Sequence, residues 1–83
     1  MTTIDAVRSF IVTNFYVPET IVLTDDVSLL ELGIVDSTGV LEVTAFLESE
    51  YGIEVADHEI VPANMDSIRA IAAFVEVKAA RAA

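Results

Sequence analysis

Apolar residues recur at helical spacing in three separate segments of this chain, and this pattern decides the class of fold it can adopt. We expect main helices over about residues 3–16 and 37–51, and a third that begins after Asp66. The one alternating run, Ile53-Glu54-Val55, is short and has no partner run, so it predicts a linker rather than a strand. The predicted buried stripes are Ile4, Val7, Ile11 and Phe15 with Phe10; Val40, Val43, Leu47 and Tyr51 with Phe46; and Ile68, Ile71, Ala72 and Val75 with Phe74.

Capping and helix-breaking residues set the expected boundaries of the first two helices. Thr2 or Thr3 can cap the first helix, and Pro18 cannot continue it. Asp36 is the candidate N-cap of the second helix, and Gly52 is placed to stop it.

The rest of the chain is expected to hold one short helix before the last main helix. Asp57 is the candidate cap of the short helix, which Pro62 is expected to close, and Asp66 is the candidate cap of the last helix. A length of 83 residues is enough for one domain and no more. We therefore expect a single domain over residues 1–83 with an all-α fold. It should be a four-helix bundle of three main helices and one short helix, with a long loop between helices one and two.

That loop, over about residues 18–36, is longer than most connections in compact domains, and such loops are often functional. The run Ser28-Leu29-Leu30-Glu31 has the pattern of a capping box, so a short helical turn is expected within the loop. We expect Leu29, Leu30 and Leu32 to tie this turn to the core.

The charge of the chain is strongly negative, at −10, and unevenly distributed. Twelve acidic residues and no lysine or arginine lie between Glu19 and Asp66. Nucleic acids and anionic membranes would repel such a chain, whereas partners with basic patches would be attracted. The alternative interpretation is that the acids only keep the protein soluble. Crowding of the acids is also expected to raise some carboxyl pKa values in the folded state.

Several classes of protein are disfavoured by what the chain lacks. It has no cysteine, which excludes disulfides and thiolate metal sites. No apolar run approaches the roughly 18 residues of a membrane span. The first residues do not have the pattern of a secretory signal, so a cytoplasmic location is expected.

Enzymatic chemistry has little support in the sequence. The single histidine, His58, is best interpreted as a solvated residue, and there is no G-x-S-x-G elbow. No H-E-x-x-H motif or calcium loop is present, and acids such as Asp25 and Asp26 would hold a hard cation only without specificity. We expect no catalytic residue and no metal site.

The segment Leu32-Gly33-Ile34-Val35-Asp36-Ser37 places a serine in the first turn of a predicted helix, after a long loop and beside an aspartate. In one interpretation, Asp-Ser is an ordinary helix start. In the other, Ser37 is exposed and fixed in direction, and the helix N-terminus favours a phosphate bonded to its oxygen. The residues alone leave both interpretations open.

This segment, followed by an acidic amphipathic helix, is similar to the phosphopantetheine attachment motif of acyl and peptidyl carrier proteins. The resemblance extends over nearly the whole chain and includes the stretches 48–55 and 61–75. It implies a covalent 4′-phosphopantetheine arm derived from coenzyme A. The arm would also supply the thiol that the cysteine-free chain lacks. The closing Pro-x-Asn-x-x-Ser-Ile-x-Ala-Ile pattern looks more like stand-alone carriers of amino acids or specialised acyl chains than like the housekeeping fatty-acid carrier.

The resemblance also implies roles for individual residues. Ser37 would accept the arm through its hydroxyl, and Asp36 would help to set the helix start and to bind the metal of the transferase. The expected partner-binding residues of the second helix are Thr38, Leu41, Glu42, Ala45 and Glu48, with Glu50 as a further acid. Two positions depart from the family's pattern. Thr38 replaces the usual leucine or methionine, and Gly39 should weaken the first helical turn.

The function implied is that of a monomeric, non-enzymatic acyl or aminoacyl carrier. Its cargo would be a thioester, presented to partners in fatty-acid, polyketide or nonribosomal-peptide-type biosynthesis. The partners implied are a phosphopantetheinyl transferase, an acyl- or aminoacyl-activating ligase and downstream enzymes with basic docking patches. One alternative is an unmodified acidic interaction module that has kept a carrier-like fold, which Thr38 and Gly39 would favour. Another is a small enzyme that uses Ser37, for which a base is missing.

Overall fold

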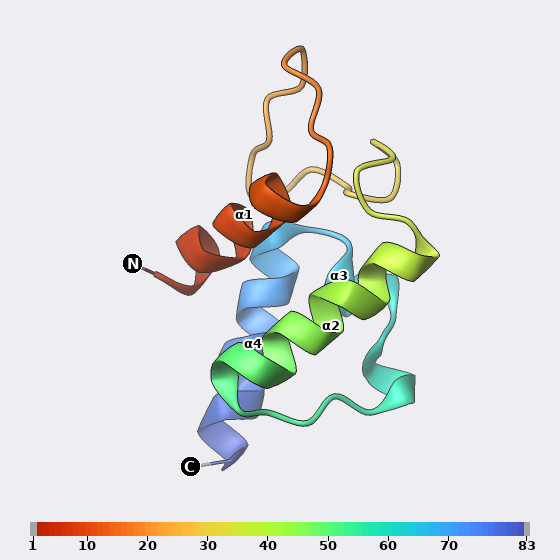
Figure 1. Ribbon diagram of the computed structural model, residues 1–83. Coiled ribbons are helices and arrows are strands. Elements are labelled where there is room, and N and C mark those ends of the chain that lie inside the picture. The colour runs from red at the N-terminus through yellow and green to blue at the C-terminus, as the bar shows by residue number, and fades with distance from the viewer. Residues whose placement is uncertain (1, 83) are drawn as a thin grey trace.

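The computed structural model describes residues 2–82 and is built from helices joined by irregular segments (Figure 1). The helices are α1 (Thr3–Asn14), α2 (Ser37–Tyr51), α3 (Pro62–Met65) and α4 (Ile68–Ala82), with a short 3-10 helix, η1 (Asp57–Glu59). No strand occurs among the described residues. The predicted all-α fold of three main helices, one short helix and a long loop is therefore confirmed.

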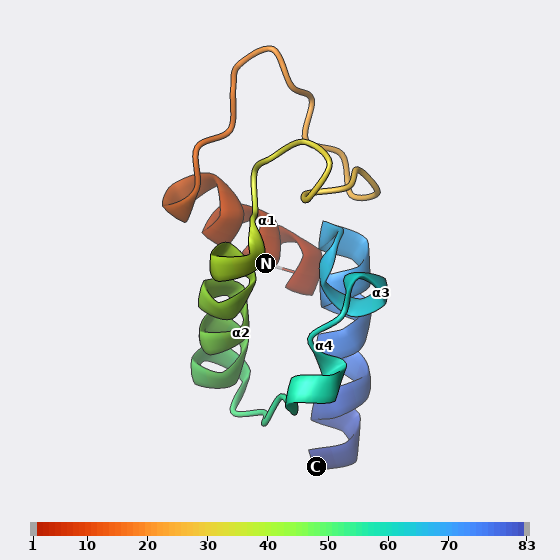
Figure 2. The same ribbon diagram turned by 90° about the vertical axis from the view of Figure 1, so that its right-hand side faces the viewer.

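Helix α4 is the element on which the others assemble, because α1, α2 and α3 all approach it. In Figure 2, α2 and α4 run alongside each other, and the long loop lies at the end of the molecule where both helices begin. The buried core comes from all three main helices and from the connecting segments. Its members are Val7, Ile11, Leu29, Ile34, Val35, Val43, Leu47, Ile53, Met65, Ile68, Ile71, Phe74 and Val75. The buried residues of each predicted stripe face this core, and the stripe residues Ile4, Phe15, Val40 and Tyr51 pack against it while partly exposed.

The ends of α1 and α2 follow from local chemistry. The Thr2 hydroxyl accepts a hydrogen bond from the Asp5 N–H at 3.1 Å, so Thr2 is the N-cap of α1. Helix α1 ends at Asn14, two residues before the predicted end, because the backbone of Phe15 is already extended. Helix α2 spans the predicted residues and ends at Gly52, which has the left-handed conformation (φ 64°) that glycine adopts without strain.

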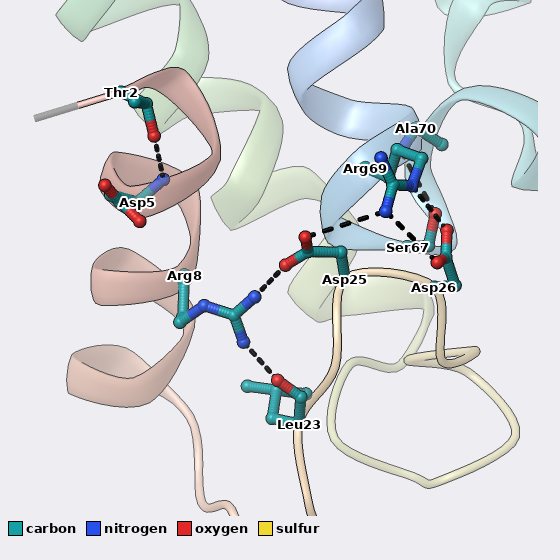
Figure 3. Close-up of polar contacts among 9 residues, drawn as sticks. All are labelled: Thr2, Asp5, Arg8, Leu23, Asp25, Asp26, Ser67, Arg69 and Ala70. Carbon is teal, nitrogen blue, oxygen red and sulfur yellow. Dashed lines mark hydrogen bonds and ion pairs between the residues drawn. The ribbon is translucent and has the colours of Figure 1, made fainter.

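Two arginines fasten the middle of the long loop to the helices (Figure 3). Arg8 of α1 donates hydrogen bonds to the Leu23 carbonyl and to the Asp25 carboxylate. Arg69 of α4 binds Asp26 through Nε and Oδ1 at 2.6 Å, and its Nη2 lies 3.7 Å from Asp25. Asp25 and Asp26, which sequence reasoning considered as weak cation ligands, are ion-pair partners of these arginines.

The predicted leucine turn is present as a single turn rather than a helix. The Leu32 N–H donates to the Ser28 carbonyl at 3.1 Å, and the Ser28 hydroxyl accepts from the Glu31 N–H at 3.1 Å. Leu29 is fully buried, but Leu30 is 39% and Leu32 37% exposed. The prediction that all three leucines enter the core was therefore wrong for two of them, because a single turn presents only one of its faces to the interior.

The segment between α2 and α4 differs from the prediction in two respects. Pro62 begins α3 rather than closing a helix that Asp57 starts. The fixed φ of proline and its missing N–H suit the first helical position. The cap of α4 is Ser67, whose hydroxyl accepts from the Ala70 N–H at 3.1 Å. Asp66, the predicted cap, ends α3.

The Asp66 carboxylate instead holds the leucine turn. Its Oδ2 accepts from the Ser28 hydroxyl at 2.6 Å, and its Oδ1 accepts from the Leu30 N–H at 2.9 Å. The Asp66 carbonyl accepts from the Leu29 N–H at 2.8 Å. The junction of α3 and α4 thereby fixes the part of the loop that leads to α2.

Candidate functional site at the start of helix α2

Ser37 is the first residue of α2, and its side chain is exposed. The two residues that precede Asp36, Ile34 and Val35, are buried, and the N–H groups of both donate to the Leu29 carbonyl, at 3.0 and 3.2 Å. An anchored segment therefore leads directly to an exposed hydroxyl. This is the arrangement that the sequence predicted for Ser37.

Asp36 caps the helix as predicted. Its Oδ1 accepts a hydrogen bond from the Gly39 N–H at 2.7 Å, and its carbonyl accepts from the Val40 N–H at 2.9 Å. Among the hydrogen bonds within residues 2–82, none uses the N–H of Ser37 or Thr38 as donor. These two groups and the helix dipole give the start of α2 a partial positive charge, which favours an anion such as a phosphodiester on Ser37.

Gly39 is buried on the inner side of this first turn. A Cβ atom at this position would lie 2.8 Å from Cε1 of Phe15 and 3.3 Å from Asp36 Oδ1. The first distance is shorter than the contacts that Cβ atoms make in proteins. From the sequence, Gly39 was expected to weaken the first helical turn. The structure shows a packing requirement instead, because this residue faces the interior rather than a partner.

The predicted partner-binding residues lie on the outward side of α2. Thr38, Leu41, Glu42, Ala45 and Glu48 are all exposed, and their spacing places them along one side of the helix. Leu41 is 58% exposed. Helix α2 therefore presents an apolar residue among acids next to Ser37. We refer to these five residues as the outer stripe.

The Glu48 side chain also forms a hydrogen bond within the protein, which was not predicted from the sequence. Its Oε2 accepts a hydrogen bond from the Val55 N–H at 3.0 Å. Glu48 therefore fastens the linker after α2 while its side chain remains at the surface. The sequence separation of the two residues hides this contact from motif analysis.

The acids divide into those with internal partners and those without. Arg69 holds the pKa of the Asp26 carboxyl below its usual value through a hydrogen bond and its charge. The pKa of Glu59 is also lowered, first by the Ala56 N–H and then by Lys78, whose Nζ lies 2.9 Å from Oε1. The shift of these two pKa values is thus opposite to the rise expected from crowding, because the hydrogen-bonding partners and nearby cations outweigh desolvation.

His58 is exposed in η1, and no group of three or more metal-ligating side chains occurs within residues 2–82. Surface cavities of about 370 and 260 Å³ are lined by other residues and do not include Ser37. No helix in the described part of the chain is long and apolar enough to cross a membrane.

Comparison with known protein families gives a match over most of the chain. The model of a family described as "phosphopantetheine attachment site" matches residues 5–75, which include most of α1, the long loop, α2, α3 and about the first half of α4. A comparison with curated proteins gives no match.

Proposed function

The chain belongs to the phosphopantetheine attachment family, and on that premise we propose that Ser37 is the residue that carries the arm. Members of this family hold 4′-phosphopantetheine covalently and act as carriers. The observation that carries the proposal is the position of Ser37. It is an exposed hydroxyl at the first residue of a capped helix, within the matched region and within the motif that resembles the attachment sequence.

The residues around Ser37 fit a phosphate ester. The hydroxyl is accessible, and the N–H groups of Ser37 and Thr38 lie at the positive end of α2. The Asp36 carboxylate is already engaged with the Gly39 N–H, so Asp36 can hold the helix start and still face solvent near a transferase-bound metal. The attached group supplies a thiol on which an acyl or aminoacyl cargo is carried as a thioester.

The proposed partners follow from the outer stripe and from the charge. A phosphopantetheinyl transferase that uses coenzyme A and magnesium would install the arm. An acyl- or aminoacyl-activating ligase would load it, and biosynthetic enzymes with basic patches would take the cargo. Leu41 and Ala45 would supply apolar contacts to these partners, and Glu42 and Glu48 would supply charge. We propose that the chain acts as a monomeric, non-catalytic carrier in biosynthesis of the fatty-acid, polyketide or nonribosomal-peptide type.

Intact mass after incubation with coenzyme A, magnesium and a broad-specificity transferase tests this function. The wild type should gain the mass of one phosphopantetheine, and Ser37→Ala should gain none. The Ser49→Ala variant is the matched control, because Ser49 is another exposed serine of α2 and its loss should leave the mass gain intact. Mass gain by Ser37→Ala would reject the attachment site. No gain by the wild type would favour an unmodified interaction module instead.

A further inference from the structure

The first turn of α2 rests on the ring of Phe15, the residue that directly follows α1. Three atoms surround the place where a side chain at residue 39 would begin. Cε1 of Phe15 is 2.8 Å from that point, and Asp36 Oδ1 and Val35 Cγ1 are each 3.3 Å away. The absence of a side chain at Gly39 therefore decides how closely this turn approaches α1.

Phe15 is itself held in place from the side of α1. Its N–H donates to the Ile11 carbonyl at 3.0 Å, and its ring meets the Phe10 ring at 72° with centroids 6.1 Å apart. Phe10 is stacked on Phe46 of α2, with centroids 4.1 Å apart. Movement of the Phe15 ring toward α1 would therefore disturb this stack. The other way to relieve a clash with a side chain at residue 39 is displacement of the first turn of α2.

The same contact reaches the cap of α2. Asp36 Oδ1, which accepts the Gly39 N–H at 2.7 Å, is also one of the three atoms that a side chain at residue 39 would meet. Ser37 lies between these two residues in the same turn. A shift at residue 39 therefore alters the cap and the direction of the Ser37 hydroxyl together.

We propose that Phe15 and Gly39 are positioning residues for the modification of Ser37. The ring of Phe15 and the missing side chain of Gly39 set the depth of the first turn and hence the orientation of the hydroxyl offered to the transferase. This inference rests on the proposed function of Ser37. Gly39 is buried, so it acts through the turn rather than by touching the transferase.

The test compares four proteins: wild type, Gly39→Ala, Phe15→Leu and the double variant. Because alanine favours helix more than glycine does, propensity alone would make Gly39→Ala a stabilising change. We expect Gly39→Ala to lower kcat for transfer of phosphopantetheine by about tenfold or more, as misplacement of a reacting group does. The KM for the carrier should change less than about twofold, because the outer stripe is untouched.

Recovery of kcat in the double variant would distinguish a positioning effect from a loss of fold. Leucine lacks the ring atom that alanine at residue 39 would meet, so the double variant should recover kcat to within about threefold of wild type. In two-dimensional NMR spectra, the Ser37 amide signal should shift in Gly39→Ala and return in the double variant. Phe15→Leu alone should lower kcat by about threefold, because the turn loses its support. Ser49→Ala, on the exposed side of α2, should match the wild type.

Three outcomes would overturn the proposal: a folded Gly39→Ala protein modified as fast as wild type, a double variant as slow as Gly39→Ala, or an unchanged Ser37 signal. If Gly39→Ala does not fold, Phe15→Leu decides, and an unchanged kcat rejects the proposal. Failure of the wild type to gain mass is a different result. It would reject the proposed function of Ser37, and with it the positioning role of Phe15 and Gly39.

Discussion

The Asp66 carboxylate accepts hydrogen bonds from the Ser28 hydroxyl and the Leu30 N–H, although it is only partly buried. Both donors belong to the turn whose Leu29 carbonyl then accepts the N–H groups of Ile34 and Val35. A single carboxylate at the junction of α3 and α4 therefore supports the segment that presents Ser37. Loss of this side chain should be felt in stability, because it leaves polar groups of the turn without their acceptor.

We predict that Asp66→Ala lowers the free energy of unfolding by about 1.5–3 kcal/mol, the range for hydrogen bonds to a charged group. Urea denaturation measured by circular dichroism would check this value. Asp57→Ala is the control for the removed charge, because Asp57 is exposed and its side chain takes part in no hydrogen bond or ion pair within residues 2–82. The control should change stability by less than about 0.5 kcal/mol. Equal losses in the two variants would contradict a specific role for Asp66.

Helix α2 presents two different sides to its surroundings. Its inner side contributes Val43 and Leu47 to the core, and its outer stripe carries Glu42 and Glu48 at the surface. The two acids of the stripe are not equivalent, because Glu48 also accepts the Val55 N–H. Reversal of their charges should therefore have different consequences for the fold.

We predict that Glu42→Lys slows phosphopantetheine transfer without changing the melting temperature, and that the slowing diminishes as salt is added. Glu48→Lys should slow transfer and also lower the free energy of unfolding by about 0.5–1.5 kcal/mol, since its hydrogen bond to Val55 is lost. Transfer rates by mass spectrometry and thermal melts would measure the two effects.

Glu19→Lys is the matched control for these reversals, because Glu19 is an exposed acid of the long loop rather than of α2. It changes the net charge by the same amount and should leave the transfer rate closer to wild type. A Glu19→Lys rate as slow as that of Glu42→Lys would show that net charge matters and the outer stripe does not.

At the scale of the whole molecule, three of the four lysine and arginine residues form ion pairs that connect parts of the fold. Arg8 and Arg69 bind the long loop, and Lys78 binds Glu59 of η1. The net charge is −10, and within residues 2–82 only Asp25, Asp26 and Glu59 form ion pairs with lysine or arginine. Two of these paired acids, Asp26 and Glu59, bear on the pH dependence of stability.

The pKa values of Asp26 and Glu59 are lowered in the folded protein by their hydrogen-bonding partners and nearby cations. A lowered carboxyl pKa means that the unfolded chain binds protons more readily, so stability is present above the unfolded pKa of about 4 and is lost as the pH falls through the folded value. We predict that unfolding free energy falls between about pH 5 and pH 3, and less steeply in Asp26→Asn/Glu59→Gln.

Urea denaturation across this pH range is the measurement. Glu42→Gln is the control, because Glu42 forms no ion pair among the described residues. Its slope against pH should follow that of the wild type. A double variant with the wild-type slope would show that the ion pairs of Asp26 and Glu59 do not govern acid stability.

The features that were predicted correctly from the sequence depend on residues close to one another in the chain. The extent of α2, its Asp36 cap, its Gly52 end and the exposed position of Ser37 were all predicted correctly. Helix caps join residues about three positions apart, and helical periodicity repeats every three to four, so both can be read from a short window. The motif around Ser37 is equally local. It indicated the phosphopantetheine attachment family, to which the comparison with family models then assigned the chain.

Other features of the molecule depend on contacts between residues that are distant in the sequence. Asp66 serves a turn 38 positions away, and Arg69 pairs with Asp26 across 43 positions. The packing against Gly39 likewise comes from the ring of Phe15, which follows α1 and lies 24 positions earlier in the chain. A capping residue or a glycine satisfies several local patterns equally well. The choice among them depends on which atoms packing brings nearby, and chain spacing does not contain that information.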